Sequence, residues 1–393
     1  MDDWTTPTFA VISGGGTSGH VVPALAIAEL LIESGHAPSS LHFVGSDRGV
    51  EVQLLAHWQY RHTLLRVAGL QRNLHLRSLA RSLVRSAAVI PMMWRAVRAA
   101  RELLKSLQPK VVVSVGGYAS IPATRAAHQL GIPVVTCSYD RRPGLATRLQ
   151  SRYAVTSAVA YMPSQLRNAQ LTGAPVRAEL RHLNRTTARH NARLRLNISQ
   201  DRQLLVVMGG SLGSAVLNST LRGVVESWSN RGDLAVLHLS GVRYLLNEIP
   251  NLVQNTNHAT DRIEYRRIAY CENMADVYAA ADLIVSRSGA SSVAEIATVG
   301  VPSILIPWKD AAENHQQANA EWLVEHGGAL LLDEVDLTVE SLGAIITDLL
   351  EDPSRLAQLG LYAYELGALH RECRIAVVIE DAARGKVQGH SQQ

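Results

Sequence analysis

The sequence predicts an α/β protein made of two doubly wound domains, each a parallel sheet enclosed by helices. The main observation is a strand, a glycine-rich turn and a helix in succession, which occurs at 9–33 and again at 204–225. A β-α-β pattern at 283–307 adds to the second half. A chain of 393 residues also exceeds the usual size of a single core. Two domains of similar architecture fit both the length and the pattern.

The turn-rich segment TGAPVR at 172–177 predicts where the two domains are linked. We expect an N-terminal domain at 1–177, a C-terminal domain at 178–375 and a tail at 376–393, with a C-terminal helix that can pack back on the first domain. Ligands of open α/β sheets bind at the carboxyl ends of the strands. The two domains are therefore expected to face each other across a ligand-binding cleft.

Composition and charge exclude several classes of protein. Hydrophobic residues make up 47% of the chain and charged residues 18%, which is typical of a folded globular protein. The net charge is +4, and most of the basic residues are arginine. This charge is too small to indicate a nucleic-acid partner, but it suits an anionic membrane surface or a phosphorylated ligand.

Cysteine spacing and the N-terminus indicate the compartment. Cys137, Cys271 and Cys373 lie far apart without metal-type spacing, which is typical of a protein in a reducing cytoplasm. The N-terminal MDDWTTPT is acidic and polar, unlike a signal peptide. No uncharged run reaches the roughly 20 residues that a membrane span needs. We expect a cytoplasmic protein that can bind peripherally to the inner face of the membrane.

The first glycine loop follows the apolar run Phe9–Ser13. Its sequence is GGGTSGH at 14–20, and a helical pattern continues to Glu33. Glycines let backbone N–H groups approach an anion, and the helix dipole adds a positive end. The loop also fits G-x-G-x-x-G, and Asp47 after the next strand suits the ribose carboxylate of a nicotinamide enzyme. A nicotinamide-dependent enzyme therefore stays an alternative at this point.

His20 stands where this loop meets the expected helix. An imidazole near a helix N-terminus tends to stay neutral, which suits a general base. The alternative is a histidine that only caps the turn.

Residues 64–107 combine many arginines with leucines and valines and include Pro-Met-Met-Trp at 91–94. Pro91 is expected to divide the stretch into two helical pieces. A basic amphipathic segment with an apolar, aromatic end is typical of a membrane-surface site. An ordinary amphipathic helix with a solvated arginine face is the alternative.

A second glycine loop, GGYASIP at 116–122, follows the apolar run Val111–Val115 and includes Tyr118. Asp140 comes at the end of the next predicted strand, so it is expected at the same sheet edge. Its carboxylate could orient an acceptor hydroxyl or act as a base. It could equally begin the turn at 141–144.

The second half carries its own glycine loop and a carboxylate. Leu204–Met208 predicts a strand, and GGSLGS follows at 209–214, where Ser211 and the backbone N–H groups suit a diphosphate. Glu295 lies about one turn into the helix of the later β-α-β unit, where it could accept hydrogen bonds from a ribose. The amides of Gln316 and Gln317 suit sugar hydroxyls, although a solvated surface position is the alternative for each. This division favours a nucleotide diphosphate in the second domain and an acceptor in the first, as in sugar-nucleotide glycosyltransferases.

Several blocks together resemble the bacterial peptidoglycan N-acetylglucosaminyltransferase family, MurG. They recur in order over roughly 8–330: GGGTSGHVVPALAIAELL, SVGGYASIPATRAA with GIPVV, TGAPVR, MGGSLGSAVLN, and RSGASSVAEIATVGVPSILIPW with HQQANA. The resemblance implies a GT-B fold and UDP-N-acetylglucosamine as donor. It also implies a polyprenyl-diphosphate-linked muramyl-peptide as acceptor and inversion at the anomeric carbon.

The resemblance also assigns roles to individual residues. His20 or Asp140 would remove the acceptor proton, and loop amides with the helix dipole, helped by Arg287, would stabilise the leaving UDP without a required metal or other cofactor. The acceptor-side loop residues are Thr17, Ser18, Gly19 and Tyr118. The donor-binding residues are Arg177, Ser211, Leu212, Gly213, Arg287, Ser288, Gly289, Glu295, Gln316 and Gln317.

The chain departs from the family pattern at three places. Cys137-Ser138-Tyr139-Asp140 stands where the family usually has His-Glu-x-Asn, Ile121 replaces a typical glycine, and Leu212 replaces a common glutamine. A related enzyme that glycosylates a small specialised metabolite is therefore an alternative. A UDP-sugar-binding or membrane scaffold protein without activity is another.

Overall fold

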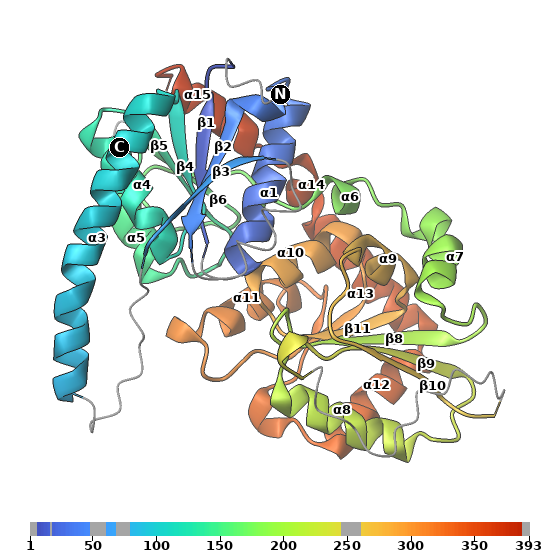
Figure 1. Ribbon diagram of the computed structural model, residues 1–393. Helices are drawn as coiled ribbons and strands as arrows, with labels where there is room; N and C mark the ends of the chain where they lie inside the picture. Colours follow the sequence, from blue (N-terminus) through green and yellow to red (C-terminus); the bar gives the residue numbers. More distant parts are fainter. Residues whose placement is uncertain (1–5, 16–17, 48–59, 68–78, 245–260, 387–393) are drawn as a thin grey trace. The chain divides into compact units, whose positions relative to one another are not determined.

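The computed structural model describes residues 6–15, 18–47, 60–67, 79–244 and 261–386, with only the backbone of 79–90. The chain forms two compact units (Figure 1). The first contains Met1–Ala178 together with Glu372–Gln393, and the second contains Glu179–Arg371. The first stretch of the first unit ends one residue beyond the expected domain boundary at 177. The second unit ends at Arg371, whereas its expected end is residue 375.

The C-terminal helix explains this difference. Helix α15 (Ile375–Ala383) belongs to the first unit and buries Ile375 and Ile379 completely, and it packs against three strands of the first sheet and against helix α1. The backbone N–H of Arg374 donates to the carbonyl of Thr172 at 2.9 Å. Part of the expected tail at 376–393 is thus an integral element of the first unit.

The first unit is built on a seven-stranded sheet in the order β3-β2-β1-β4-β5-β6-β7, within the residues that the structure describes. All its strand pairs are parallel, and the order around β1 is that of a doubly wound nucleotide-binding fold. The strands are β1 (Ala10–Ser13), β2 (Leu41–Ser46), β3 (Arg61–Leu65), β4 (Val111–Ser114), β5 (Val134–Ser138), β6 (Thr156–Val159) and β7 (Ala169–Leu171).

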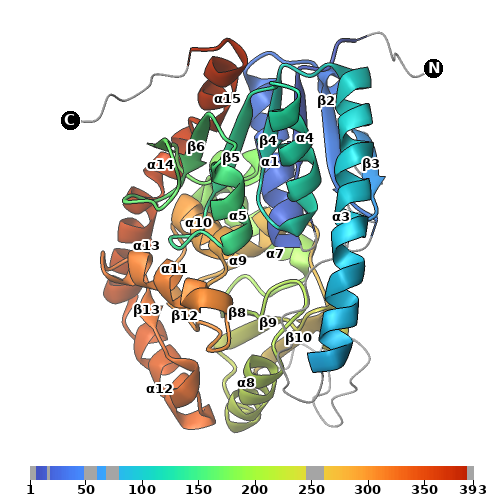
Figure 2. The same ribbon diagram turned by 90° about the vertical axis from the view of Figure 1, so that its left-hand side faces the viewer.

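Helices cover both faces of this sheet (Figures 1 and 2). Helices α3 and α4 pack together over one face, where Ala100 and Ala126 meet Val11 and Val112 in the core. Helices α1 and α15 contact each other on the opposite face. The remaining bounds are α1 (Ser18–Glu33), η1 (Pro38–Ser40), α3 (Leu79–Leu107), η3 (Tyr118–Ser120), α4 (Ile121–Gln129) and α5 (Leu145–Ser151).

Helix α3 corrects one expectation from the sequence. It runs without a break from Leu79 to Leu107 with Pro91 inside it, so the prediction of two helical pieces was wrong. Proline removes one backbone donor from a helix, and the cost is smallest where water can reach the helix. Pro91 is exposed, and the N-terminal part of α3 extends beyond the sheet in Figure 1.

The second unit has a six-stranded parallel sheet in the order β10-β9-β8-β11-β12-β13 across its described residues. The strands are β8 (Gln203–Met208), β9 (Leu234–Leu239), β10 (Glu264–Ile268), β11 (Leu283–Ser286), β12 (Ser303–Leu305) and β13 (Leu330–Leu331). Apolar side chains of β8, β9 and β11 are fully buried and pack against α8 and α12. Because all these strand pairs are parallel, the carboxyl ends of the strands lie along one edge of the sheet.

The helices and short turns of the second unit connect these strands. The helices are α6 (Ala178–Arg181), which begins at the link, α7 (Arg185–Leu196), α8 (Ala215–Ser227), α9 (Met274–Ala280), α10 (Ala290–Val299), α11 (His315–Val324), α12 (Val339–Leu350), α13 (Pro353–Leu366) and α14 (Ala368–Glu372). The 3-10 turns are η4 (Val242–Tyr244), η5 (Ala312–Asn314) and η6 (Glu334–Asp336).

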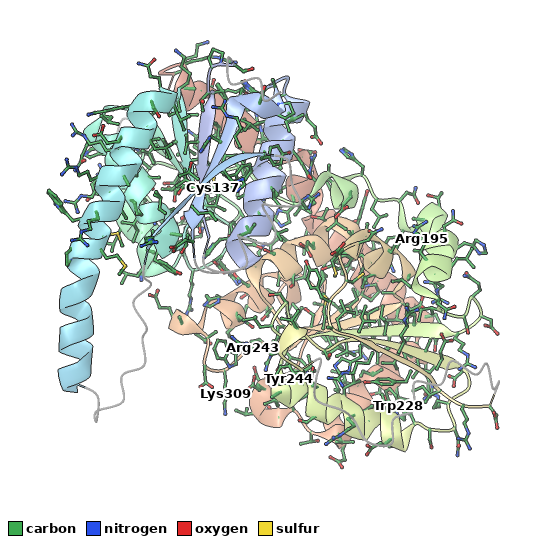
Figure 3. All side chains as sticks on the ribbon, in the orientation of Figure 1. Cys137, Arg195, Trp228, Arg243, Tyr244 and Lys309 are labelled. Atoms are coloured by element: carbon green, nitrogen blue, oxygen red, sulfur yellow. The ribbon has the colours of Figure 1, made fainter. Side chains whose placement is uncertain are left out.

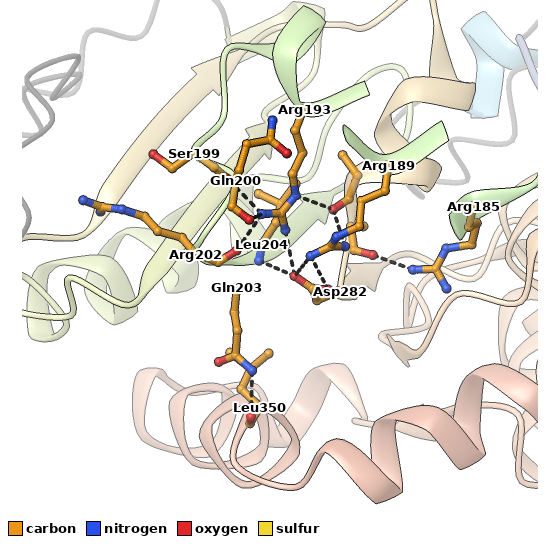
Figure 4. A network of polar contacts seen from close by, with 12 residues as sticks. Arg185, Arg189, Arg193, Ser199, Gln200, Arg202, Gln203, Leu204, Asp282 and Leu350 are labelled. Atoms are coloured by element: carbon orange, nitrogen blue, oxygen red, sulfur yellow. Dashed lines mark hydrogen bonds and ion pairs between the residues drawn. The ribbon is translucent and has the colours of Figure 1, made fainter. Parts of the chain in front are cut away.

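An arginine network holds α7 in the second unit (Figure 4). Arg185, Arg189 and Arg193 all donate to backbone carbonyls at the end of α9. Arg189 and Arg193 also bond the Asp282 carboxylate, Arg193 at 2.8 Å with its side chain fully buried. The polar segment before β8 is therefore a packed element whose buried charges are paired and hydrogen-bonded, as burial requires.

Candidate functional site

Three loops of the first unit meet at one sheet edge because β1, β4 and β5 are adjacent and parallel. The first glycine loop follows β1, Gly116 and Gly117 follow β4, and Tyr139 and Asp140 follow β5. Helix α1 begins at Ser18, so His20 lies in its first turn. The topology thus brings His20 and Asp140 to the same edge, as the sequence predicted.

The ring of His20 lies against the second glycine loop. A side-chain Cβ at Gly117 would come within 2.9 Å of its Cδ2 atom and 3.1 Å of its Nε2 atom. Gly116 and Gly117 also have φ angles of 91° and 76°, which other residues rarely adopt. Both the backbone conformation and the histidine therefore require glycine at 117.

A buried glutamine fixes this glycine loop. Gln150 on α5 donates to the carbonyl of Gly117 at 3.0 Å, and its side-chain oxygen accepts from the hydroxyls of Ser114 and Ser120 at 2.6 and 2.9 Å. The Ser120 hydroxyl also approaches the Gly116 carbonyl at 2.8 Å. These bonds hold the backbone that lies against His20, which is the kind of support that a precise site needs.

The surroundings of His20 favour its neutral form. Burial lowers the pKa of His20 below its usual 6.5, while the Asp140 carboxylate and the Val115 carbonyl act in the opposite direction. Nδ1 of His20 lies 3.0 Å from the hydroxyl oxygen of Tyr139. A neutral imidazole held by a neighbour is suited to accept a proton near pH 7.

The other predicted residues of the first unit have varied positions. Gly19 is exposed in the first turn of α1, and Ser18 begins that helix. Tyr118 is half-buried and packs against the core beside α3 and α4. Arg177, expected to bind the donor, lies in the first unit and donates through Nε to Glu29 at 2.5 Å. Thr17 lies outside the described residues.

The second unit has a corresponding edge, where the loops after β8, β11 and β12 are neighbours. Gly210 and Gly213 have positive φ angles of 84° and 80°, and a Cβ at Gly213 would lie 2.0 Å from the carbonyl oxygen of Ser240. The Ser211 carbonyl accepts from the N–H of Val242 at 3.2 Å, which ties the loop to η4. The turn leads into α8, so its backbone amides lie at a helix N-terminus, as an anion site requires.

Arg287 braces this edge from inside the unit. It is only 8% exposed, donates to the hydroxyl of Ser214 at 2.8 Å and to the carbonyl of Pro307 at 3.2 Å, and pairs with Glu334. Its guanidinium therefore joins the loop at 209–214 to the loops after β12 and β13. The resemblance places Arg287 at the leaving UDP, and in the structure its guanidinium pairs with Glu334.

The remaining donor-side residues lie along the same edge. Ser288 is buried and donates to the Gln316 carbonyl at 2.8 Å, and the Gln316 side-chain oxygen accepts from the Trp308 N–H at 3.0 Å. Gly289 caps α10, and Gln317 is half-buried on α11. Leu212 is 38% exposed at the tip of the glycine loop.

Glu295 on α10 is positioned by a buried tyrosine. The Tyr278 hydroxyl donates to the Glu295 carboxylate at 2.7 Å. Burial and the negative charge of Glu295 raise the pKa of Tyr278 well above its usual value, so this hydroxyl keeps its proton. A half-buried carboxylate that is held in place by a buried tyrosine is well suited to accept hydrogen bonds from a ribose diol.

Sequence reasoning missed the supporting residues Tyr139, Gln150, Tyr278 and Glu334. Tyr139 lies in the unusual 137–140 stretch, which was the only signal available for any of them. The described residues contain no cluster of three or more potential metal ligands and no helix long and apolar enough to cross a membrane.

Comparison with known proteins gives consistent results. The glycosyltransferase family 28 N-terminal domain matches residues 10–159, and the C-terminal domain of that family matches 204–363. The crystal structure of Acinetobacter baumannii MurG has a TM-score of 0.70 at 23% identity and covers 96% of this chain and 100% of its own. The glycosyltransferase of kitacinnamycin has a TM-score of 0.65 at 16% identity, with 96% and 99% covered.

The two parallel sheets together with the two family matches define a glycosyltransferase with the GT-B fold, which confirms the predicted fold class. Two curated relatives carry the name UDP-N-acetylglucosamine–N-acetylmuramyl-(pentapeptide) pyrophosphoryl-undecaprenol N-acetylglucosamine transferase. The one from Desulforudis audaxviator is 35% identical over 95% of this chain and 98% of its own length, and the one from Streptomyces coelicolor 33% over 91% and 93%. The chain belongs to the MurG family of glycosyltransferases. This membership excludes the nicotinamide enzyme.

The contact between Gly117 and His20 gives a testable prediction. Gly117→Ala should reduce kcat by about 100-fold, because a Cβ there displaces the His20 ring and small misplacements of a catalytic group have effects of that size. Gly131→Ala is the matched control, since Gly131 also has a positive φ of 71° but no atom within 4 Å of an added Cβ. Turnover and thermal unfolding of both variants are the measurements. Equal kcat values for the two variants would contradict a role of the His20 ring in catalysis.

Proposed function

We propose that this chain transfers N-acetylglucosamine from UDP-N-acetylglucosamine to a hydroxyl of a polyprenyl-diphosphate-linked muramyl-peptide, with inversion at the anomeric carbon. The observation that carries the proposal is the similarity to relatives named for this reaction, at 33–35% identity over 91% or more of the chain. The geometry of both sheet edges supports it, because each provides one half of the required chemistry.

The second unit would hold the donor. Glu295 accepts hydrogen bonds from the ribose, the loop at 209–213 binds the diphosphate, and Gln316 and Gln317 bind the sugar. The bracing of this edge by Arg287 and the fixing of Glu295 by Tyr278 support these roles, because a preorganised edge loses little freedom when it binds.

The first unit would supply the base. His20 takes the proton from the acceptor hydroxyl while the oxygen attacks the anomeric carbon from the side opposite to UDP. The bond between the anomeric carbon and the β-phosphate oxygen breaks, and its electron pair leaves with UDP. Asp140 would stabilise the imidazolium that forms, in keeping with its effect on the pKa of His20.

The leaving UDP gains negative charge, which the second unit can stabilise without a divalent metal. The backbone amides of the loop at 209–213 and the dipole of α8 act on the diphosphate. Two exposed cations, Arg243 on η4 and Lys309 after β12, lie at the same edge (Figure 3). They supply positive charge to the diphosphate, whereas the charge of the buried Arg287 is already paired with Glu334.

A lipid-linked acceptor also requires contact with a membrane surface, and α3 has a suitable face. Trp94 is 69% exposed, and Arg98 and Arg101 lie exposed on the same face at i+4 and i+7. Tryptophan prefers the interface between lipid and water, and arginine attracts anionic lipids. We propose that this face holds the protein peripherally on the cytoplasmic side of the membrane.

Single substitutions at the two sheet edges test whether the first unit supplies the base and the second binds the nucleotide. His20→Ala should lower kcat by about 100-fold or more but leave UDP affinity unchanged, because a general base contributes at that level. Glu295→Ala should weaken UDP binding by about tenfold or more through the loss of charge-assisted hydrogen bonds. The measurements are turnover with a lipid-linked acceptor and calorimetric titration with UDP. Wild-type turnover only with small soluble acceptors would favour the specialised-metabolite alternative.

The pH dependence of kcat/KM tests the state of His20. The base must be neutral, and burial lowers its pKa, so the rate should stay level from about pH 8 through about pH 6.5 and fall only at lower pH. The residual activity of His20→Ala should lack this acidic limb. A wild-type limb centred above the ordinary histidine pKa would contradict the assignment.

Binding to vesicles tests the membrane face. Trp94→Ser combined with Arg98→Glu should strongly reduce co-sedimentation with vesicles that contain anionic lipid, because the anchor and part of the attraction are lost. Trp308→Ser, an exposed tryptophan of the second unit, is the control that should sediment like wild type. If the double variant sediments like wild type, α3 is not the membrane contact.

A further inference from the structure

A proline in α1 leaves one backbone carbonyl of that helix without its usual donor. Pro23 lies inside α1 and has no N–H, so it cannot donate to the carbonyl of Gly19 four residues earlier. The Gly19 carbonyl is therefore left able to accept a hydrogen bond from a group outside the helix. This carbonyl directly precedes His20 in the chain.

The partner comes from the end of β5. The Tyr139 hydroxyl donates to the Gly19 carbonyl in a short hydrogen bond. Tyr139 is buried, and burial together with the negative charge of Asp140 raises the pKa of its hydroxyl well above the usual value, so the proton is present. Because a phenol has a single hydrogen, the Gly19 carbonyl takes the only one that Tyr139 can donate.

The same hydroxyl oxygen lies 3.0 Å from Nδ1 of His20. With its hydrogen committed to Gly19, the oxygen can only accept in this second contact. Nδ1 of His20 must therefore carry a hydrogen, and the neutral ring keeps its lone pair on Nε2. Nε2 is the nitrogen that faces the Cβ position left empty by Gly117.

We propose that Tyr139 is a positioning residue that holds His20 in the tautomer protonated at Nδ1, so that Nε2 receives the proton of the acceptor hydroxyl. This inference rests on the proposed role of His20 as base. When Nε2 takes the proton, the Nδ1–H bond to Tyr139 persists, and the ring does not need to turn during the transfer. The electron pair released on the acceptor oxygen forms the new bond to the anomeric carbon.

The groups around the ring fit this arrangement. The Asp140 carboxylate and the Val115 carbonyl stabilise the imidazolium, and burial opposes it. Gln150 holds the Gly117 backbone on one side of the ring, and Tyr139 holds Nδ1. The ring is thereby fixed in both place and protonation pattern, which is what a base needs before the substrate arrives.

Nuclear magnetic resonance of the protein with nitrogen-15-labelled histidine tests the proposal, because the shifts of Nδ1 and Nε2 distinguish the two neutral tautomers. His20→Gln identifies the His20 signals. The wild-type protein should show Nδ1–H at His20, and Tyr139→Phe should populate the other tautomer. Tyr139→Phe should also lower kcat by about tenfold or more at unchanged UDP affinity, since a base in the wrong tautomer is inactive. Tyr153→Phe, which alters a tyrosine whose ring packs at a tilt against that of His128 in the same unit, should change neither property.

A second variant tests the origin of the effect. Pro23→Ala restores an N–H donor for the Gly19 carbonyl, which then competes with the Tyr139 hydroxyl for that oxygen, so the other tautomer should gain population although Tyr139 is intact. A wild-type spectrum with Nε2–H at His20 would overturn the proposal, even if Tyr139→Phe failed to fold. If His20→Ala kept full turnover, the role of His20 as base would fail separately, because the spectrum reports the tautomer without any reaction.

Discussion

Close approach between neighbouring loops is the constraint on which both sheet edges depend. In the first unit Gly117 lies so near His20 that a Cβ would come within 2.9 Å of the ring, and in the second Gly213 lies so near Ser240 that a Cβ would come within 2.0 Å of its carbonyl oxygen. A parallel sheet brings its loops together at the carboxyl ends of the strands. Two loops can therefore lie this close together only where one of them has a glycine, because glycine has no Cβ.

Buried polar groups then keep these crowded loops in one arrangement. Gln150 fixes the loop that lies against His20, Tyr278 fixes Glu295, and Arg287 with Glu334 fixes the loop at 209–214. A satisfied buried network specifies a single structure, since breaking it leaves unpaired polar atoms. The positions of His20, Glu295 and the loop at 209–214 in this chain thus depend on buried polar residues behind them.

The fold, and the positions of His20 and Glu295 at the two sheet edges, could be predicted because their sequence signals are local. Strand, glycine turn and helix follow one another directly, and each candidate lies within or just after such a unit. Tyr139 and Gln150 could not be found in this way, because their partners lie more than 25 residues away and only the sheet order brings them together. The resemblance placed Arg287 at the donor, but its pairing with Glu334 could not be predicted, because Glu334 follows a different strand. Pro91 shows that an exposed helix can continue through a proline.

The central claim is that the second unit binds the nucleotide while the first supplies the base. A crystal structure of the UDP complex tests it most directly. The account predicts the diphosphate on the amides of the loop at 209–213 and the ribose hydroxyls on Glu295. A diphosphate bound at the first glycine loop beside His20, with the second edge empty, would contradict it.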